Sequence, residues 1–77
     1  MPRTLADLPH GHAGILGELR VPPEVAARLM ELGFVPGACV VALRRAPGGD
    51  PRVFRVDGGV VALRGETARR LMLRAAS

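Results

Sequence analysis

The sequence has no lysine, tryptophan or tyrosine, and two phenylalanines are its only aromatic residues among 77. A hydrophobic core must therefore be compact and aliphatic, because Phe34 and Phe54 are the only aromatic side chains. The hydrophobic fraction of 48%, with spaced glycines and prolines, indicates a folded domain and excludes a disordered tail. A chain of this size buries only about 60% of its unfolded surface, so we expect one small domain over residues 1–77.

Cysteine occurs once, at Cys39, which excludes an internal disulfide and favours a reducing compartment. The first residues lack the apolar core of a signal peptide. No apolar run approaches the roughly 20 residues that cross a bilayer. We therefore expect a cytoplasmic protein that meets a membrane only through a partner.

All of the basic side chains are arginines, and the formal net charge is +4. Arginine suits carboxylate and phosphate contacts, although a GC-rich coding sequence gives the same composition. On a barrel, a basic face could be formed by Arg44, Arg45, Arg52, Arg55 and Arg64. Proteins that bind single-stranded nucleic acid usually add aromatic stacking platforms, and Phe34 is the only candidate for one in this sequence. Solvated arginines are the favoured interpretation, and no nucleic-acid partner is expected.

One amphipathic helix is predicted to begin at Pro22 and Pro23, because proline fits a first helical turn, where its missing N–H has no partner. Apolar side chains then recur at Val25, Leu29 and Leu32, which is helical spacing.

The helix is predicted to end at Gly33, since glycine adopts positive φ at little cost. Pro36 and Gly37 stop the helix from resuming, and a strand begins near Val40. Residues 29–37 are therefore expected to form a helix-to-strand corner.

Short strand-like runs surround this corner at residues 15–19, 38–44, 52–56, 60–64 and 71–74. Asp57-Gly58-Gly59 is a hairpin signal between the third and fourth runs. A tight turn at residues 4–9 is expected to bury Leu5 and Leu8, and residues 65–70 form one helical turn at most. The predicted fold is mainly β, a small five-stranded barrel with one helix inserted after the first strand. Closure of the barrel would remove exposed strand edges.

Candidate catalytic and metal-binding groups are sparse. His10 and His12 could supply two imidazoles, but Cys39 is too distant in sequence to be assumed a third ligand. We predict no metal site and no cofactor. The carboxylates form no evident acid–base pair, and the glycine-rich turns match neither a P-loop nor a dinucleotide fingerprint. The sequence therefore does not indicate an enzyme.

The second strand is apolar on both faces, because Cys39, Val41 and Leu43 alternate with Val40 and Ala42. Such a strand is either covered by the chain's own helix or N-terminal turn, or it meets another protein. A second copy of the chain is one such partner.

The order of these residues resembles the FeoA family over almost the whole chain. The matching residues are Leu5-x-x-Leu8-Pro9-x-Gly11, Arg28-Leu29-x-Glu31-Leu32-Gly33-Phe34-x-Pro36-Gly37, Arg45-Ala46-Pro47-x-Gly49-Asp50-Pro51, and Gly58 with Ala62-Leu63-Arg64 and Glu66. The resemblance implies an SH3-like barrel and a small cytoplasmic accessory protein of bacterial ferrous iron transport. Its implied partner is FeoB, a membrane transporter with a cytoplasmic GTP-binding domain. The alternatives are an SH3-like nucleic-acid-binding module and a metal-dependent regulatory module.

The predicted partner-binding residues form two groups. The helix and corner supply Arg28, Met30, Glu31 and Phe34 as candidate surface residues, and the second strand supplies Val41 and Leu43. A structural signature is expected to hold the surface in shape; it comprises Leu29, Leu32, Gly33, Pro36, Gly37, Pro47, Gly49, Asp50 and Pro51.

Overall fold

The structure is a computed structural model that describes residues 2–45 and 48–74. In chain order its elements are η1 (Leu5–Asp7), β1 (Ala13–Leu19), α1 (Pro23–Glu31), β2 (Cys39–Arg45), β3 (Arg52–Val56), β4 (Gly59–Leu63), α2 (Gly65–Ala68) and β5 (Leu71–Leu73). Their types and order agree with the predicted ones, and the largest difference in a strand boundary is that β1 starts at Ala13 instead of Ile15. None of the described helices is long and apolar enough to span a bilayer.

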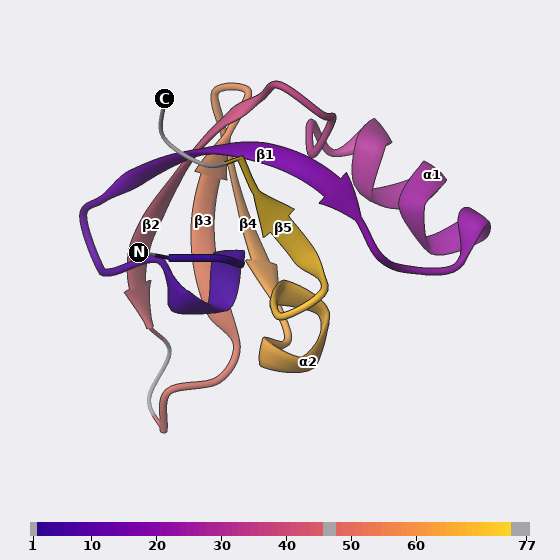
Figure 1. Ribbon diagram of the computed structural model, residues 1–77. Coiled ribbons are helices and arrows are strands. Elements are labelled where there is room, and N and C mark those ends of the chain that lie inside the picture. The colour runs from indigo at the N-terminus through magenta and orange to yellow at the C-terminus, as the bar shows by residue number, and fades with distance from the viewer. Residues whose placement is uncertain (1, 46–47, 75–77) are drawn as a thin grey trace.

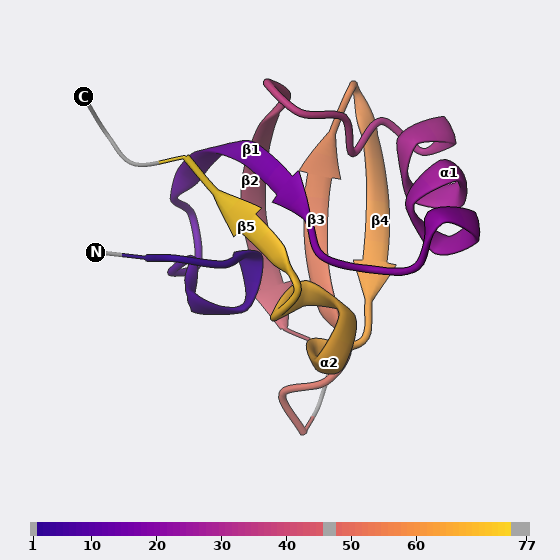
Figure 2. The same cartoon turned by 45° about the vertical axis from the view of Figure 1, so that its right-hand side comes forward.

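All of the strands belong to one five-stranded sheet in the order β4-β3-β2-β1-β5, and each neighbouring pair is antiparallel (Figure 1). The sheet curves, so that β1 crosses in front of β2 and β3 in Figure 1 and β5 lies beside β1 (Figure 2). This confirms the mainly β fold with one helix after the first strand. The expectation of a closed sheet is wrong in one respect, since β4 and β5 do not pair within the described residues. The helical turn α2 separates these two strands, and β5 is only 3 residues long.

The core fills the space inside the curved sheet and is almost wholly aliphatic. Both phenylalanines, Phe34 and Phe54, are fully buried. Other fully buried side chains of η1 and the strands include Leu5, Leu16, Val40, Ala42 and Leu71. The prediction that Leu5 and Leu8 are buried is confirmed. The N-terminal turn therefore belongs to the core.

Arg52 holds this N-terminal turn in place from inside the fold. Its side chain is only 4% exposed, because Arg52 shares the inward face of β3 with Phe54 and Val56. Its Nη1 donates to the carbonyl of Ala6 at 2.6 Å and its Nη2 to the carbonyl of Leu8 at 2.8 Å. The guanidinium carbon lies 5.5 Å from the centre of the Phe54 ring. The interpretation of Arg52 as part of a solvated basic face is therefore wrong.

The β3–β4 connection is a hairpin, as predicted, and its turn has two residues because Gly59 already belongs to β4. Val56 pairs with Gly59, and the intervening Asp57 and Gly58 have φ values of 50° and 76°. Positive φ at both central residues is the signature of a type I′ turn, whose twist matches that of the flanking strands. This hairpin places Asp57 against the end of α1.

Candidate functional site

Helix α1 ends in a Schellman motif. Gly33 has φ +106°, its N–H donates to the carbonyl of Met30 at 3.0 Å, and the N–H of Phe34 donates to the carbonyl of Leu29 at 3.0 Å. In this motif the residue after the glycine folds back onto the last turn of the helix. Phe34 and Leu29 are accordingly both buried in the core.

This geometry corrects two expectations about the corner. Phe34 is 0% exposed, so its assignment as a surface residue that contacts a partner is wrong. Leu32 continues the helical spacing of Val25 and Leu29 in the sequence, but its side chain is 46% exposed. Helix α1 ends at Glu31, so Leu32 does not continue its apolar face, and the side chain of Phe34 packs into the core instead.

A tight turn connects the Schellman motif to β2. The N–H of Ala38 donates to the carbonyl of Val35 at 2.9 Å, with Pro36 and Gly37 as the central residues and Gly37 at φ +95°. Proline followed by glycine at these positions is typical of a type II turn. The N–H of Gly37 also donates to the carbonyl of Leu16 at 2.7 Å, which ties the turn to β1.

Gly33 also lies against the β3–β4 hairpin. A methyl group in place of its α-hydrogen would come within 2.8 Å of the Cβ atom of Asp57 and 3.5 Å of a methyl carbon of Val56. A glycine is therefore required for close approach as well as for φ. The end of α1, the tight turn that follows it and the β3–β4 hairpin therefore lie close together at Gly33.

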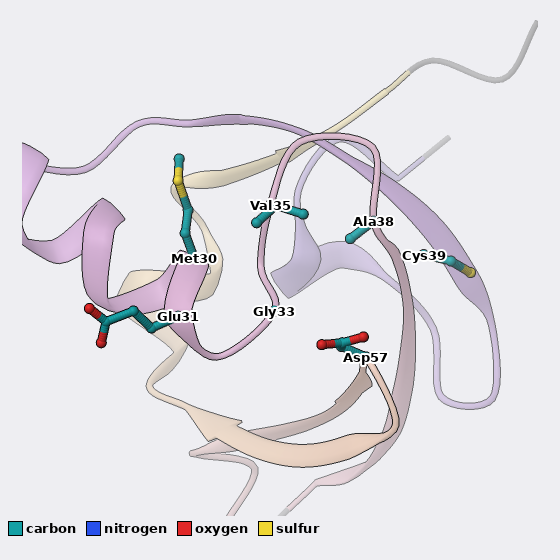
Figure 3. Close-up of a pocket in the computed structure, with 7 residues that line it drawn as sticks. All are labelled: Met30, Glu31, Gly33, Val35, Ala38, Cys39 and Asp57. Carbon is teal, nitrogen blue, oxygen red and sulfur yellow. The ribbon is translucent and has the colours of Figure 1, made fainter.

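The end of α1, the tight turn and the β3–β4 hairpin border an open hollow of about 460 Å³, which we call the corner groove. The residues that line it are Met30, Glu31, Gly33, Val35, Ala38, Cys39 and Asp57. Figure 3 shows the carboxylate of Asp57 below Gly33 and Ala38, whereas the carboxylate of Glu31 points away from the hollow. Met30 is 41% exposed and Val35 is 40% exposed. The groove thus combines two accessible apolar side chains, Met30 and Val35, with the carboxylate of Asp57.

The predicted contact residues are distributed over two surfaces. Arg28, Met30 and Glu31 are exposed on α1, and Met30 and Glu31 line the corner groove. Val41 and Leu43 are half-buried on β2. Three residues of the groove were missed from the sequence, namely Val35, Ala38 and Asp57. The sequence predicts a hairpin turn at Asp57-Gly58, but nothing in the sequence shows which other segment this turn contacts.

The structure does not bring together His10, His12 and Cys39, the residues considered as metal ligands. Cys39 pairs with Ile15 at the start of β2, whereas the loop of His10 and His12 bonds to Ala42, further along the same strand. Within the described ranges, no group of three or more His, Cys, Asp or Glu side chains could hold a metal ion.

In the part of the structural signature that follows β2, Asp50 forms a hydrogen bond to a distant segment. The carboxylate of Asp50 accepts a hydrogen bond at 3.0 Å from the N–H of Gly65, the first residue of α2. Pro47 lies outside the described residues. Asp50 therefore links the β2–β3 loop to the segment before β5.

The chain is similar to known proteins in both sequence and fold. The FeoA domain family model matches residues 3–75. The solution structure of FeoA from Chlorobium tepidum is 31% identical with a TM-score of 0.88, over 96% of this chain and 70% of that one. Iron(II) transport protein A from Clostridium thermocellum is 30% identical with a TM-score of 0.84, over 91% of this chain and 43% of that one.

A crystal structure of zinc-bound FeoA from Stenotrophomonas maltophilia is 33% identical with a TM-score of 0.76, over 92% of this chain and 88% of that one. That protein is described as an SH3 domain protein and a candidate activating factor of bacterial ferrous iron transport. None of the curated proteins matches the chain significantly.

The open five-stranded sheet, the helix after its first strand and these structural relatives define an SH3-like domain. The chain belongs to the FeoA family, which is linked to ferrous iron transport as an accessory factor and is not known as a family of enzymes.

Proposed function

We propose that this protein is a cytoplasmic, non-enzymatic accessory of a ferrous iron transporter, and that its corner groove binds the cytoplasmic region of a FeoB-type partner. The observation that carries the proposal is the exposure of Met30 and Val35 across a hollow whose rim is held by the backbone hydrogen bonds of the helix end and the tight turn. Accessible apolar side chains in a concave, preorganised site are what a protein partner can bury with little loss of conformational entropy.

Charge indicates the chemistry of the bound segment. The chain carries a net charge of +4, yet the carboxylate that lies below Gly33 and Ala38 in the groove is that of Asp57, and Glu31 stands at the rim with its carboxylate pointing away (Figure 3). An apolar segment flanked by arginine or lysine complements such a site, and like-charge segments are disfavoured. The groove is therefore proposed to accept an apolar, basic segment of the transporter's cytoplasmic region.

The proposal is tested by the affinity of the folded protein for the purified cytoplasmic region of its FeoB-type transporter. Met30→Glu places a carboxylate in the groove, and we expect the Kd to rise at least about tenfold, since a hot-spot contact near the centre of an interface is worth about 2 kcal/mol or more. Leu32→Glu is the matched control, because Leu32 is equally exposed, at 46%, but does not line the groove. The control should bind like the wild type.

Two results would contradict the proposal. One is a Met30→Glu variant that keeps wild-type affinity. The other is an equal loss of affinity in both variants, which would indicate a general charge effect instead of a specific groove.

A further inference from the structure

The two edges of the sheet differ in how they are covered. At the β5 edge, the N–H of Leu73 donates to the carbonyl of Arg3 at 2.8 Å, and Thr4 forms a bridge with Met72. The N-terminal segment thus covers that edge. At the opposite edge, β4 pairs with β3 alone among the described residues.

The β4 strand itself lacks the charges, prolines and bulges that usually discourage pairing with another chain. Natural edge strands carry charges, prolines or bulges that discourage an additional strand. Residues 58–63 contain no charged residue and no proline, and β4 pairs with β3 through consecutive residues without a bulge. Val60 is 62% exposed, more than any other large hydrophobic side chain in the described part of the chain.

Hairpin geometry shows which backbone groups face outward. The residues that flank a two-residue turn exchange both backbone hydrogen bonds, and such pairs alternate along an antiparallel ladder. Val56 and Gly59 flank this turn, so Gly59, Val61 and Leu63 direct their backbone groups toward β3. The backbone N–H and C=O groups of Val60 and Ala62 therefore face the open edge.

We propose that β4 pairs with β4 of a second copy of this chain, antiparallel and about a two-fold axis at Val61. Val60 of each copy then exchanges both backbone hydrogen bonds with Ala62 of the other, which uses the groups that face outward. The side chains of Val60 and Ala62 lie on the same face of the strand and would cover one another across the interface.

Charge complementarity supports a second copy as the occupant. Asp57 lies two residues before β4 and Arg64 directly after it. The side chain of Arg64 is 83% exposed, and its Nη1 lies 4.0 Å from the carboxylate of Glu66 in the same chain. In the proposed register Arg64 lies across from Gly58 of the second copy, next to its Asp57, at both ends of the interface. Opposite charges thus meet at each end, and no like charges face each other within the strand.

Sedimentation equilibrium over a range of protein concentrations tests the pairing. We expect a concentration-dependent dimer for the wild type, and a dissociation constant at least about tenfold higher for Val60→Lys, because the symmetric interface receives two lysines. Ile15→Lys is the matched control: Ile15 is also an exposed strand residue, but it pairs with Cys39 and lies away from the β4 edge. The control should dimerise like the wild type, and so should the groove variant Met30→Glu, which separates this proposal from the proposed function.

Amide hydrogen exchange gives a second readout at the same positions. The amides of Val60 and Ala62 should become protected only at concentrations where the dimer forms, whereas Val61 and Leu63 should be protected throughout. A wild type that remains monomeric, equal weakening by both lysine variants, or a dimer with unprotected Val60 and Ala62 would each overturn the proposal. Protection that requires the transporter's cytoplasmic region would also overturn it, since the occupant would then be a strand of that partner.

Discussion

Replacement of Gly33 by alanine tests how firmly the corner is held together. An L-residue at positive φ costs about 1–2 kcal/mol, and a methyl group forced into an occupied space costs about 1–3 kcal/mol more. Gly33 has φ +106°, and an added methyl group would lie 2.8 Å from the Cβ atom of Asp57. We therefore expect Gly33→Ala to destabilise the fold by about 2–5 kcal/mol, a large share of the roughly 4–12 kcal/mol available to a domain of this size.

Thermal and urea unfolding measure this loss, and Gly11→Ala is the matched control. Gly11 also has positive φ, at +84°, but nothing lies within 4 Å of its missing methyl group. It should therefore lose only about 1–2 kcal/mol, or roughly 4–16 °C in Tm. Removing the Asp57 side chain in an Asp57→Gly background should recover about 1–3 kcal/mol of the Gly33→Ala loss. Equal losses at Gly33 and Gly11, or no recovery in that background, would refute the close contact between helix end and hairpin.

Two further substitutions probe the core that supports the corner. Arg52→Met removes the hydrogen bonds to the carbonyls of Ala6 and Leu8, and we expect it to lower the free energy of unfolding in urea by about 2–4 kcal/mol. Arg55→Met, on the exposed side of the same strand, should leave this free energy within about 0.5 kcal/mol of the wild type. Equal effects of these two would contradict the buried role of Arg52. Phe34→Ala empties a fully buried site and should cost about 3–5 kcal/mol, while a stability loss below about 1 kcal/mol would show that Phe34 is at the surface.

Local sequence signals predicted most of the backbone. Gly33 and the Asp57-Gly58 pair adopt positive φ as expected, because glycine preferences act over a few neighbouring residues. The two-residue period of a strand likewise places Phe54 and Val56 together on the inward face of β3. The same alternation places Arg52 inward, so this signal was available although the charge of arginine favoured a solvated interpretation.

Contacts between distant segments could not be predicted in the same way. Phe34 is buried because the Schellman motif turns it back onto Leu29, whereas helical spacing alone favoured Leu32. The corner groove depends on Asp57, which is far in sequence from Met30 and Val35. The open β4 edge is a property of the whole sheet, since it depends on where β5 pairs.

The central claim is that the corner groove binds the cytoplasmic region of a FeoB-type transporter. The most direct measurement is a titration of the isotope-labelled protein with that region, followed by backbone chemical shifts. We expect the largest changes to cluster at Met30, Gly33, Val35, Ala38 and Asp57. A contradictory result would be saturable binding whose shift changes lie elsewhere, with the groove residues unaffected.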